Sequence, residues 1–185
     1  RINKASDDAA GLSIADSLKA QQRVATVAIR NANDGISSIA IADAALAEIG
    51  NTLTRMAELS EQSANGVFST TQRSALQDEF TALASEVERI AITTNFNGVK
   101  LLSGGSSMVL QVGFDSGSTS QISYTGVQGT LASLGLAGVG QSSLSYSLNA
   151  TTVAGGQSAA RATLDAVNAA ISSLAQTRGT LGAAE

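Results

Sequence analysis

The clearest pattern in the chain is a long run of apolar or small residues at alternating steps of four and three. The run extends from Ile14 to Met56 without a change of phase, and Gln21 is its only polar member. Such spacing is typical of a helix that packs against partner helices. The triplet "NDG" at 33–35 is a turn signal, but a turn would reset the phase. The pattern therefore predicts one continuous helix, with a kink at Gly35 as the alternative.

The predicted helix begins near Ser6, a good N-cap, and Asp7 and Asp8 suit the positive end of its dipole. It ends at "SANG", where Asn65-Gly66 is expected to supply left-handed backbone. At 1.5 Å per residue, such a helix is about 85–90 Å long. Glycine inside a helix costs about 1 kcal/mol relative to alanine, and close packing against a neighbouring backbone would offset this cost.

Two shorter segments repeat the same spacing, from about Thr70 to Thr94 and from about Gln157 to the end of the chain. Three apolar seams of one period predict a mainly α fold, an elongated antiparallel three-segment helical bundle or coiled coil. Arg178 interrupts the third seam. The predicted seam residues are Leu18, Ala28, Ala32, Gly35, Ile39, Leu46, Ile49, Leu53 and Met56, then Leu76, Phe80, Leu83, Val87 and Ile90, then Leu164, Val167, Ile171 and Leu174.

The middle of the chain has a different composition, rich in Gly, Ser and Thr. The runs "MVLQVGF" and "QISYTGV" flank "DSGSTS" and predict a β-hairpin, and "SLSYSLNATTV" is a candidate further strand. We expect a small β-hairpin cap at one end of the bundle. The predicted organisation is therefore helices over 1–105, a short β-rich region over 106–156, and a helix over 157–185 that packs back on the first part.

Composition excludes much of the chemistry that enzymes use. The chain has no His, Cys or Pro among its 185 residues, so His-based zinc sites, catalytic triads and thiolates are ruled out. No metal-loop or phosphate-loop spacing is present, and we expect no enzyme activity, cofactor or metal. A net charge of −4 without a basic patch argues against nucleic acid, and no apolar run is long enough for a membrane span.

Several long motifs resemble one family. "RINKASDDAAGLSIAD", "RNANDGISSIAIADAALAEIGNTLTRMAELSEQSANG" and "TNFNGVKLLSGG" are similar to the amino-terminal conserved region of bacterial flagellin, and "ARATLDAVNAAISSLAQTRGTLGA" to its carboxy-terminal region. The resemblance covers about 1–105 and 157–185. It implies the rod-like domain of a filament subunit, with the flanking terminal helices outside this chain.

The same resemblance implies a function and partners. A flagellin is exported through the flagellar channel and assembles helically with other flagellin subunits into the extracellular filament that drives motility. An export chaperone and a cap protein are further partners that the family implies.

In many flagellins the segment corresponding to "LTRMAELSEQSANG" binds Toll-like receptor 5 and also contacts neighbouring subunits. Arg55, Leu59 and Gln62 lie at steps of four and three, so they can share an exposed face of the helix. For a generic helix, an ordinary solvated face is the simpler interpretation. Ala57 and Glu61 depart from the residues of better-known receptor activators. The positions that match the family's contact surface are Arg55, Leu59, Gln62 and Glu79.

Charged residues beside the first seam have two interpretations of equal weight. Arg23, Arg30, Asp34, Asp43 and Glu48 either contact other subunits or form ordinary surface pairs.

Two alternative functions remain open from the sequence. The related hook–filament junction protein shares the helical ends, although "NFNGVKLL" favours flagellin proper. A surface adhesin could use the same rod, but sugar binding favours aromatic platforms, and Tyr124 and Tyr146 are the only tyrosines in a chain without Trp.

Overall fold

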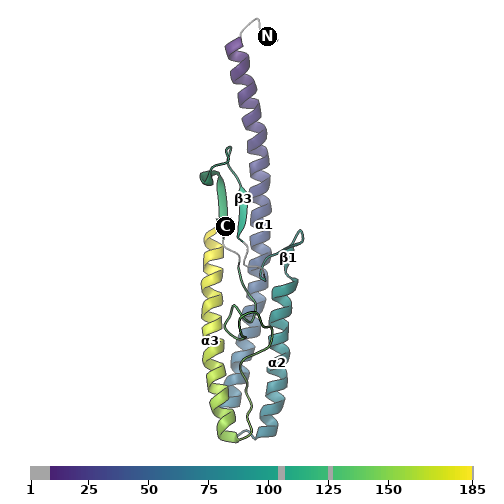
Figure 1. Cartoon of the computed structure of the whole chain (residues 1–185), viewed down its shortest axis with the longest axis vertical. Coiled ribbons are helices and arrows are strands. Elements are labelled where there is room, and N and C mark those ends of the chain that lie inside the picture. The colour runs from purple at the N-terminus through teal and green to yellow at the C-terminus, as the bar shows by residue number, and fades with distance from the viewer. Residues whose placement is uncertain (1–8, 104–106, 125–126, 185) are drawn as a thin grey trace. The chain divides into compact units, whose positions relative to one another are not determined.

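The computed structural model describes residues 9–103, 107–124 and 127–184, and within them the chain is mainly helical (Figure 1). The helices are α1 (Ala9–Ala64), α2 (Thr70–Thr93) and α3 (Val153–Ala184). The prediction of one helix through 33–35 is confirmed, because α1 continues across Gly35. The predicted start near Ser6, with its acidic first turn, lies outside the described residues.

The described residues form two compact units that share α1. Unit 1 contains α1 up to Ser37 together with β3 (Met108–Gln111), the short 3-10 helix η1 (Ser118–Ser120) and β4 (Gln121–Tyr124). Unit 2 contains α1 from Ser38 onward, α2, β1 (Asn95–Phe96), β2 (Val99–Lys100), an irregular segment over 127–152, and α3.

In unit 2, α2 runs antiparallel to α1. Arg73, near the start of α2, contacts Ser63 near the end of α1, whereas Glu79, further along α2, contacts the earlier Arg55. The predicted antiparallel packing is confirmed for this pair of helices.

α3 also runs antiparallel to α1, and therefore parallel to α2 (Figure 1). Arg178 near its end pairs with Asp43, and Leu174 packs against Gly50, where an added Cβ would lie 3.3 Å from Leu174 Cδ2. The absence of a side chain at position 50 lets the two helices approach closely.

The core of unit 2 follows the predicted period, but small residues occupy much of its centre. The first seam is buried from Ile39 to Met56 and continues into Ser60 and Ser63. The buried residues of the other two helices are Arg73, Phe80, Ala84, Val87, Ile90 and Ala91 in α2, and Gly156, Ala160, Thr163, Val167, Ala170, Leu174 and Leu181 in α3.

Several predicted seam residues lie off this centre. Half-buried flanking positions are taken by Ala32, Leu76, Leu83, Leu164 and Ile171. Leu18 was predicted on the seam but is 59% exposed, because no described part of unit 1 covers α1 at that level. The prediction of a buried seam is therefore wrong at Leu18 within this single chain.

A buried guanidinium holds the end of α1. Arg73 donates from Nε to the Ser63 carbonyl at 2.8 Å and from Nη2 to the Asn65 carbonyl at 2.7 Å, and Nη1 donates to the Phe68 carbonyl. The last carbonyls of a helix have no partner inside it, and this side chain supplies one.

The expected left-handed ending at Asn65-Gly66 is wrong, because neither residue has a positive φ. Among the described residues, positive φ occurs at Asn97, Gly98, Gly135 and Gly140.

Local signals fix both ends of α2. Ser69 and Gln72 form a capping box, in which the Ser69 hydroxyl accepts from the Gln72 amide and the Gln72 side chain accepts from the Ser69 amide. After α2, Asn97 (φ 49°) and Gly98 (φ 80°) form a tight turn between β1 and β2. Positive φ at both central residues is the geometry that a two-residue hairpin requires.

The irregular segment 127–152 contributes to the core of unit 2. Its backbone at Ser147 and Leu148 is bonded by side chains of all three helices: Ser63 donates to the Leu148 carbonyl, Thr163 to the Ser147 carbonyl, and Gln77 accepts from the Leu148 amide. The predicted further strand over 143–153 is wrong, because these helix side chains take the bonds that a sheet would use. α3 begins at Val153, four residues before its predicted start at Gln157.

Unit 1 contains the predicted hairpin. β3 pairs antiparallel with β4 from Met108–Tyr124 to Gln111–Gln121. Its Leu110 side chain fills the space above Gly35, where an added Cβ would lie 2.2 Å from Leu110 Cδ1. Gly35 therefore receives a hairpin side chain, not the neighbouring helix backbone that the sequence led us to expect.

Gly35→Ala should reveal this contact through its dependence on Leu110. Alanine improves helix propensity by about 1 kcal/mol, but in the parent its Cβ collides with Leu110, so we expect little gain or a loss. In a Leu110→Ala background, the same change should stabilise by about 1 kcal/mol. Urea denaturation of the four variants measures the coupling. Gly179→Ala, which meets nothing within 4 Å, is the control, and additive effects would contradict the contact.

Arg73→Met should destabilise unit 2 strongly, because it leaves three backbone carbonyls without their donor. We expect a loss of about 3 kcal/mol or more, which lowers Tm by roughly 6–12 °C for a chain of this size. The exposed Arg89→Met is the matched control and should change Tm little. Thermal unfolding followed by circular dichroism measures both, and equal shifts would disprove the role of Arg73.

Candidate interaction surface

The described residues offer candidate contact surfaces on the helices. Across residues 9–103, 107–124 and 127–184, no three His, Cys, Asp or Glu side chains come together as a metal site. Among the helices of this described part, none combines the length and apolar character that crossing a bilayer requires.

Arg55, Gln62 and Glu79, three of the four positions that match the family's contact surface by resemblance, are exposed on α1 and α2. Arg55 on α1 donates to Glu79 Oε1 on α2, at 3.0 Å from Nε and 2.8 Å from Nη2. It also reaches Glu58 Oε2 at 2.9 Å from Nη1. The hydrogen bond to Glu58 and then that to Glu79 raise the pKa of Arg55 above its ordinary value. Arg55 thus stays charged while held by two carboxylates.

Leu59 does not belong to this exposed face. It is fully buried in the core of unit 2, whereas Gln62, one turn further along α1, is exposed. The prediction that Arg55, Leu59 and Gln62 share an exposed face is wrong at Leu59, because that side chain points into the helical bundle.

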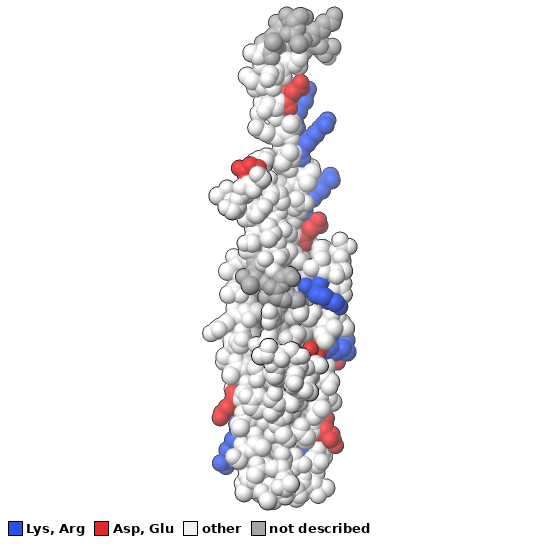
Figure 2. Space-filling model, viewed as in Figure 1, with Lys and Arg blue, Asp and Glu red and all other residues white. Residues whose placement is uncertain are grey.

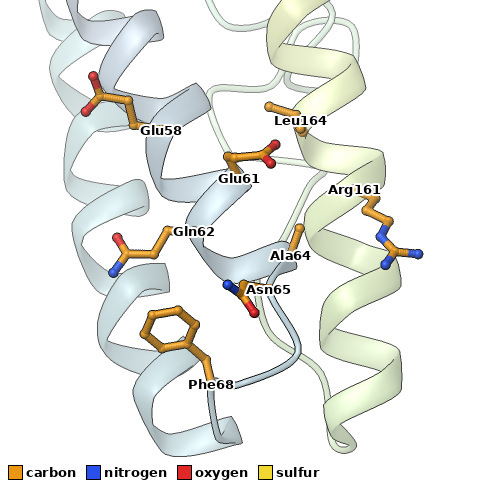
Figure 3. Close-up of a pocket in the computed structure, with 8 residues that line it drawn as sticks. All are labelled: Glu58, Glu61, Gln62, Ala64, Asn65, Phe68, Arg161 and Leu164. Atoms are coloured by element: carbon orange, nitrogen blue, oxygen red, sulfur yellow. The ribbon is translucent and has the colours of Figure 1, made fainter.

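A groove of about 800 Å³ lies at the end of α1, between the turn and α3 (Figure 3). Figure 3 shows Glu61 projecting from α1 toward the α3 side, and Arg161 projecting outward from α3. We call this site the turn groove, and it is lined by Glu58, Glu61, Gln62, Ala64, Asn65, Phe68, Arg161 and Leu164.

The sequence did not single out Phe68 or Arg161, which lie on separate segments. Nothing in the periodic pattern marks a turn residue such as Phe68 or an exposed helix residue such as Arg161. Phe68 and Arg161 line the same groove because the turn after α1 lies beside α3 in the folded chain.

The first half of α1 carries an exposed charged row. Asp16, Lys19, Arg23, Arg30 and Asp34 follow helical steps of three, four and seven, so they share one face. Figure 2 shows basic side chains gathered along one side of this part of the chain. Lys19 pairs with Asp16 at 3.6 Å, while in the described part of the chain neither Arg23 nor Arg30 makes an ion pair.

Apolar side chains are also exposed along the first half of α1. Ile14 is 62% exposed and Ile29 is 63% exposed, and they are joined by Leu18, Val24, Val27 and Ile36. Isolated exposed apolar residues are common on soluble proteins, but a series along one helix marks an interaction surface.

Asp43 has an intramolecular partner in unit 2. Its carboxylate accepts from Arg178 Nε at 2.8 Å and Nη2 at 3.0 Å. The hydrogen bond from Arg178 lowers the pKa of Asp43 below its usual 3.8, helped by charge attraction and opposed by desolvation. Arg178, which interrupts the third predicted seam, thus joins α3 to α1.

Comparison with known proteins points to one family. The family described as bacterial flagellin N-terminal helical region matches residues 1–107. Polar flagellin A of Vibrio parahaemolyticus is 46% identical over 136 residues, which are 73% of this chain and 36% of that protein. Flagellin D of Vibrio cholerae is 52% identical over 118 residues, 63% of this chain and 31% of that protein. The chain thus spans about a third of the length of these curated relatives.

A solved structure supports the same likeness. The crystal structure of Bacillus cereus flagellin matches with a TM-score of 0.65 at 27% identity, over 83% of this chain and 81% of that one.

The Asp43–Arg178 pair should make stability depend on pH. Because the pKa of Asp43 is lower in the folded state, the pair stabilises the fold above about pH 4 and loses this contribution as the pH falls further. Both side chains are partly exposed, so Asp43→Asn should cost less than about 1 kcal/mol at pH 7 and nothing near pH 2. Urea denaturation at both pH values measures this, with Asp78→Asn as control. A cost that is equal at both pH values would exclude the pair as its source.

Proposed function

Because this chain belongs to the bacterial flagellin family, we propose that it forms the rod part of a structural subunit of the flagellar filament. The subunit is exported through the flagellar channel, assembles helically with copies of itself outside the cell, and serves motility without catalysing a reaction. The family membership rests on the match over 1–107 and on relatives 46–52% identical over most of the chain.

The observation that best supports self-assembly is the exposed apolar series on α1. A single molecule in water gains nothing from leaving Ile14, Leu18 and Ile29 about 60% exposed. Burying the exposed part of each such side chain against another subunit contributes about 1–2 kcal/mol. A long helix with apolar side chains outside the core of its own chain suits a polymer in which neighbouring subunits cover those side chains.

The adjoining faces of α1 and α2 are a second proposed contact surface. Arg55, Gln62 and Glu79 are exposed there and match the positions at which flagellins contact neighbouring subunits and Toll-like receptor 5. Leu59 is buried, so its role is to hold α1 in the bundle and not to touch a partner. Receptor recognition is therefore proposed for three of the four matching positions.

Other partners follow from the family. An export chaperone and a filament cap protein are proposed to bind the subunit before and during assembly. The charged residues beside the first seam are part of the same proposal. We expect four of them to contact other subunits: Arg23, Arg30, Asp34 and Glu48. Asp43 is committed to Arg178 within the chain.

Seeded assembly tests the proposed function. The full-length protein that carries this chain is purified as monomer, mixed with short filament fragments, and imaged by electron microscopy. We expect helical filaments that lengthen from the seeds, with fragments alone as control. Loss of swimming in cells that lack the protein, restored by its return, should accompany this result. The proposal would be overturned if purified monomers never extended the seeds and cells that lack the protein swam normally.

A further inference from the structure

The exposed charged row on α1 contains a basic segment with an apolar centre. Arg23, Val27 and Arg30 lie at steps of four and three on one face, and Val27 is 52% exposed. Lys19 lies one turn before Arg23, and we call these four residues the basic face. The two arginines make no ion pair among the described residues, so their charge is available to a partner.

The turn groove has two carboxylates against one cation, Arg161, which projects outward from α3 (Figure 3). Glu58 and Glu61 provide two carboxylates, of which Glu58 is shared with Arg55, and the described part of the chain gives Glu61 no ion pair. Phe68 and Leu164 add apolar surface beside them. A guanidinium can pair with a carboxylate and also lie against an aromatic ring, which makes such a groove better suited to Arg than to Lys.

We propose that the basic face of one copy of this chain docks in the turn groove of a second copy. In this contact Arg23 and Arg30 approach Glu58 and Glu61, and Val27 meets the apolar wall of the groove. The chain has a net charge of −4, so two copies repel each other unless they meet with opposite local charges. This docking rests on the proposed filament function and names one of its intersubunit contacts.

The two surfaces lie on different parts of the same chain, and this has a consequence for assembly. A contact between two different patches is heterologous, so each copy that docks leaves one free surface of each kind. Such a contact can therefore be repeated from one subunit to the next. That is the connectivity a growing filament needs.

Crosslinking of introduced thiols tests the contact directly: these 185 residues contain no Cys, and any Cys elsewhere in the full-length protein is first replaced by Ser. Val27→Cys and Gln62→Cys monomers of the full-length protein are assembled together and treated with a short bis-maleimide. We expect a covalent dimer in the mixed filament and none in filaments of either variant alone. Val27→Cys with Val139→Cys, an exposed residue outside the groove, is the control pair.

Two results of this crosslinking experiment have different meanings. Filaments that form normally but give no more dimer with Gln62→Cys than with Val139→Cys would overturn the docking while leaving the filament function intact. A parent protein that forms no filaments would overturn the filament function, and the docking that rests on it.

A charge swap tests the electrostatic part. Arg23→Glu with Arg30→Glu should raise the monomer concentration needed for assembly about tenfold, and Glu58→Lys with Glu61→Lys should do the same. Arg55 keeps Glu79 as a partner in the second variant, and Tm checks that each variant is folded. All four substitutions together should restore assembly to within about threefold of the parent.

The matched control changes the net charge by the same amount elsewhere. Arg89→Glu with Lys100→Glu alters two exposed residues of unit 2 outside the groove and should leave the assembly concentration unchanged. A combined swap that assembles no better than either half, or a control that impairs assembly equally, would refute the docking.

Discussion

The packing of unit 2 depends on one buried cation, Arg73. Its guanidinium pairs with no carboxylate of the described residues and instead binds three backbone carbonyls, at Ser63, Asn65 and Phe68. Carbonyls at the end of a helix carry the negative end of its dipole, so they can stabilise a charge that would otherwise be costly to bury. The stem of Arg73 also lies against Gly156, where an added Cβ would come within 2.9 Å of Arg73 Cδ. One side chain thus joins the end of α1, the turn, the start of α2 and the first turns of α3.

The rest of the core follows from the lack of large side chains. Only 3% of the residues are aromatic, so the helices gain stability by close approach over a long distance and not from a thick core. Ala84 and Ala91 on α2, and Ala160 and Ala170 on α3, are buried where the helices meet. Such interfaces have few sites where one substitution removes much buried surface. Arg73 is an exception because its role is hydrogen bonding at a point where several segments meet.

The sequence was sufficient for the helices and the hairpin but not for the centre of the core. The predicted seams are correct at buried residues such as Phe80, Val87 and Val167. They also included the half-buried Leu76 and Ile171, and they missed the small buried residues Ala84, Ala160 and Thr163. Small residues carry a weak hydrophobic signal, although the same four-three spacing extends through them. The candidate site was predicted in part: Arg55, Gln62 and Glu79 are exposed, but Leu59 is buried because its neighbours in space come from other helices. Segment 127–152 could not be predicted, since its bonds come from side chains far away in sequence.

A single periodic helix explains why this chain both folds on itself and is a candidate polymer subunit. The four-three series in α1 does not change where unit 1 gives way to unit 2, so the same pattern that buries Leu46 and Leu53 also places Ile14 and Leu18 in the open. In unit 2 the partners of the series are α2 and α3 of the same chain. In unit 1 the hairpin covers only the stretch around Ala28 and Gly35. Because a four-three period suits partner helices along its whole length, this uncovered stretch is where the proposed subunit assembly would make its contacts.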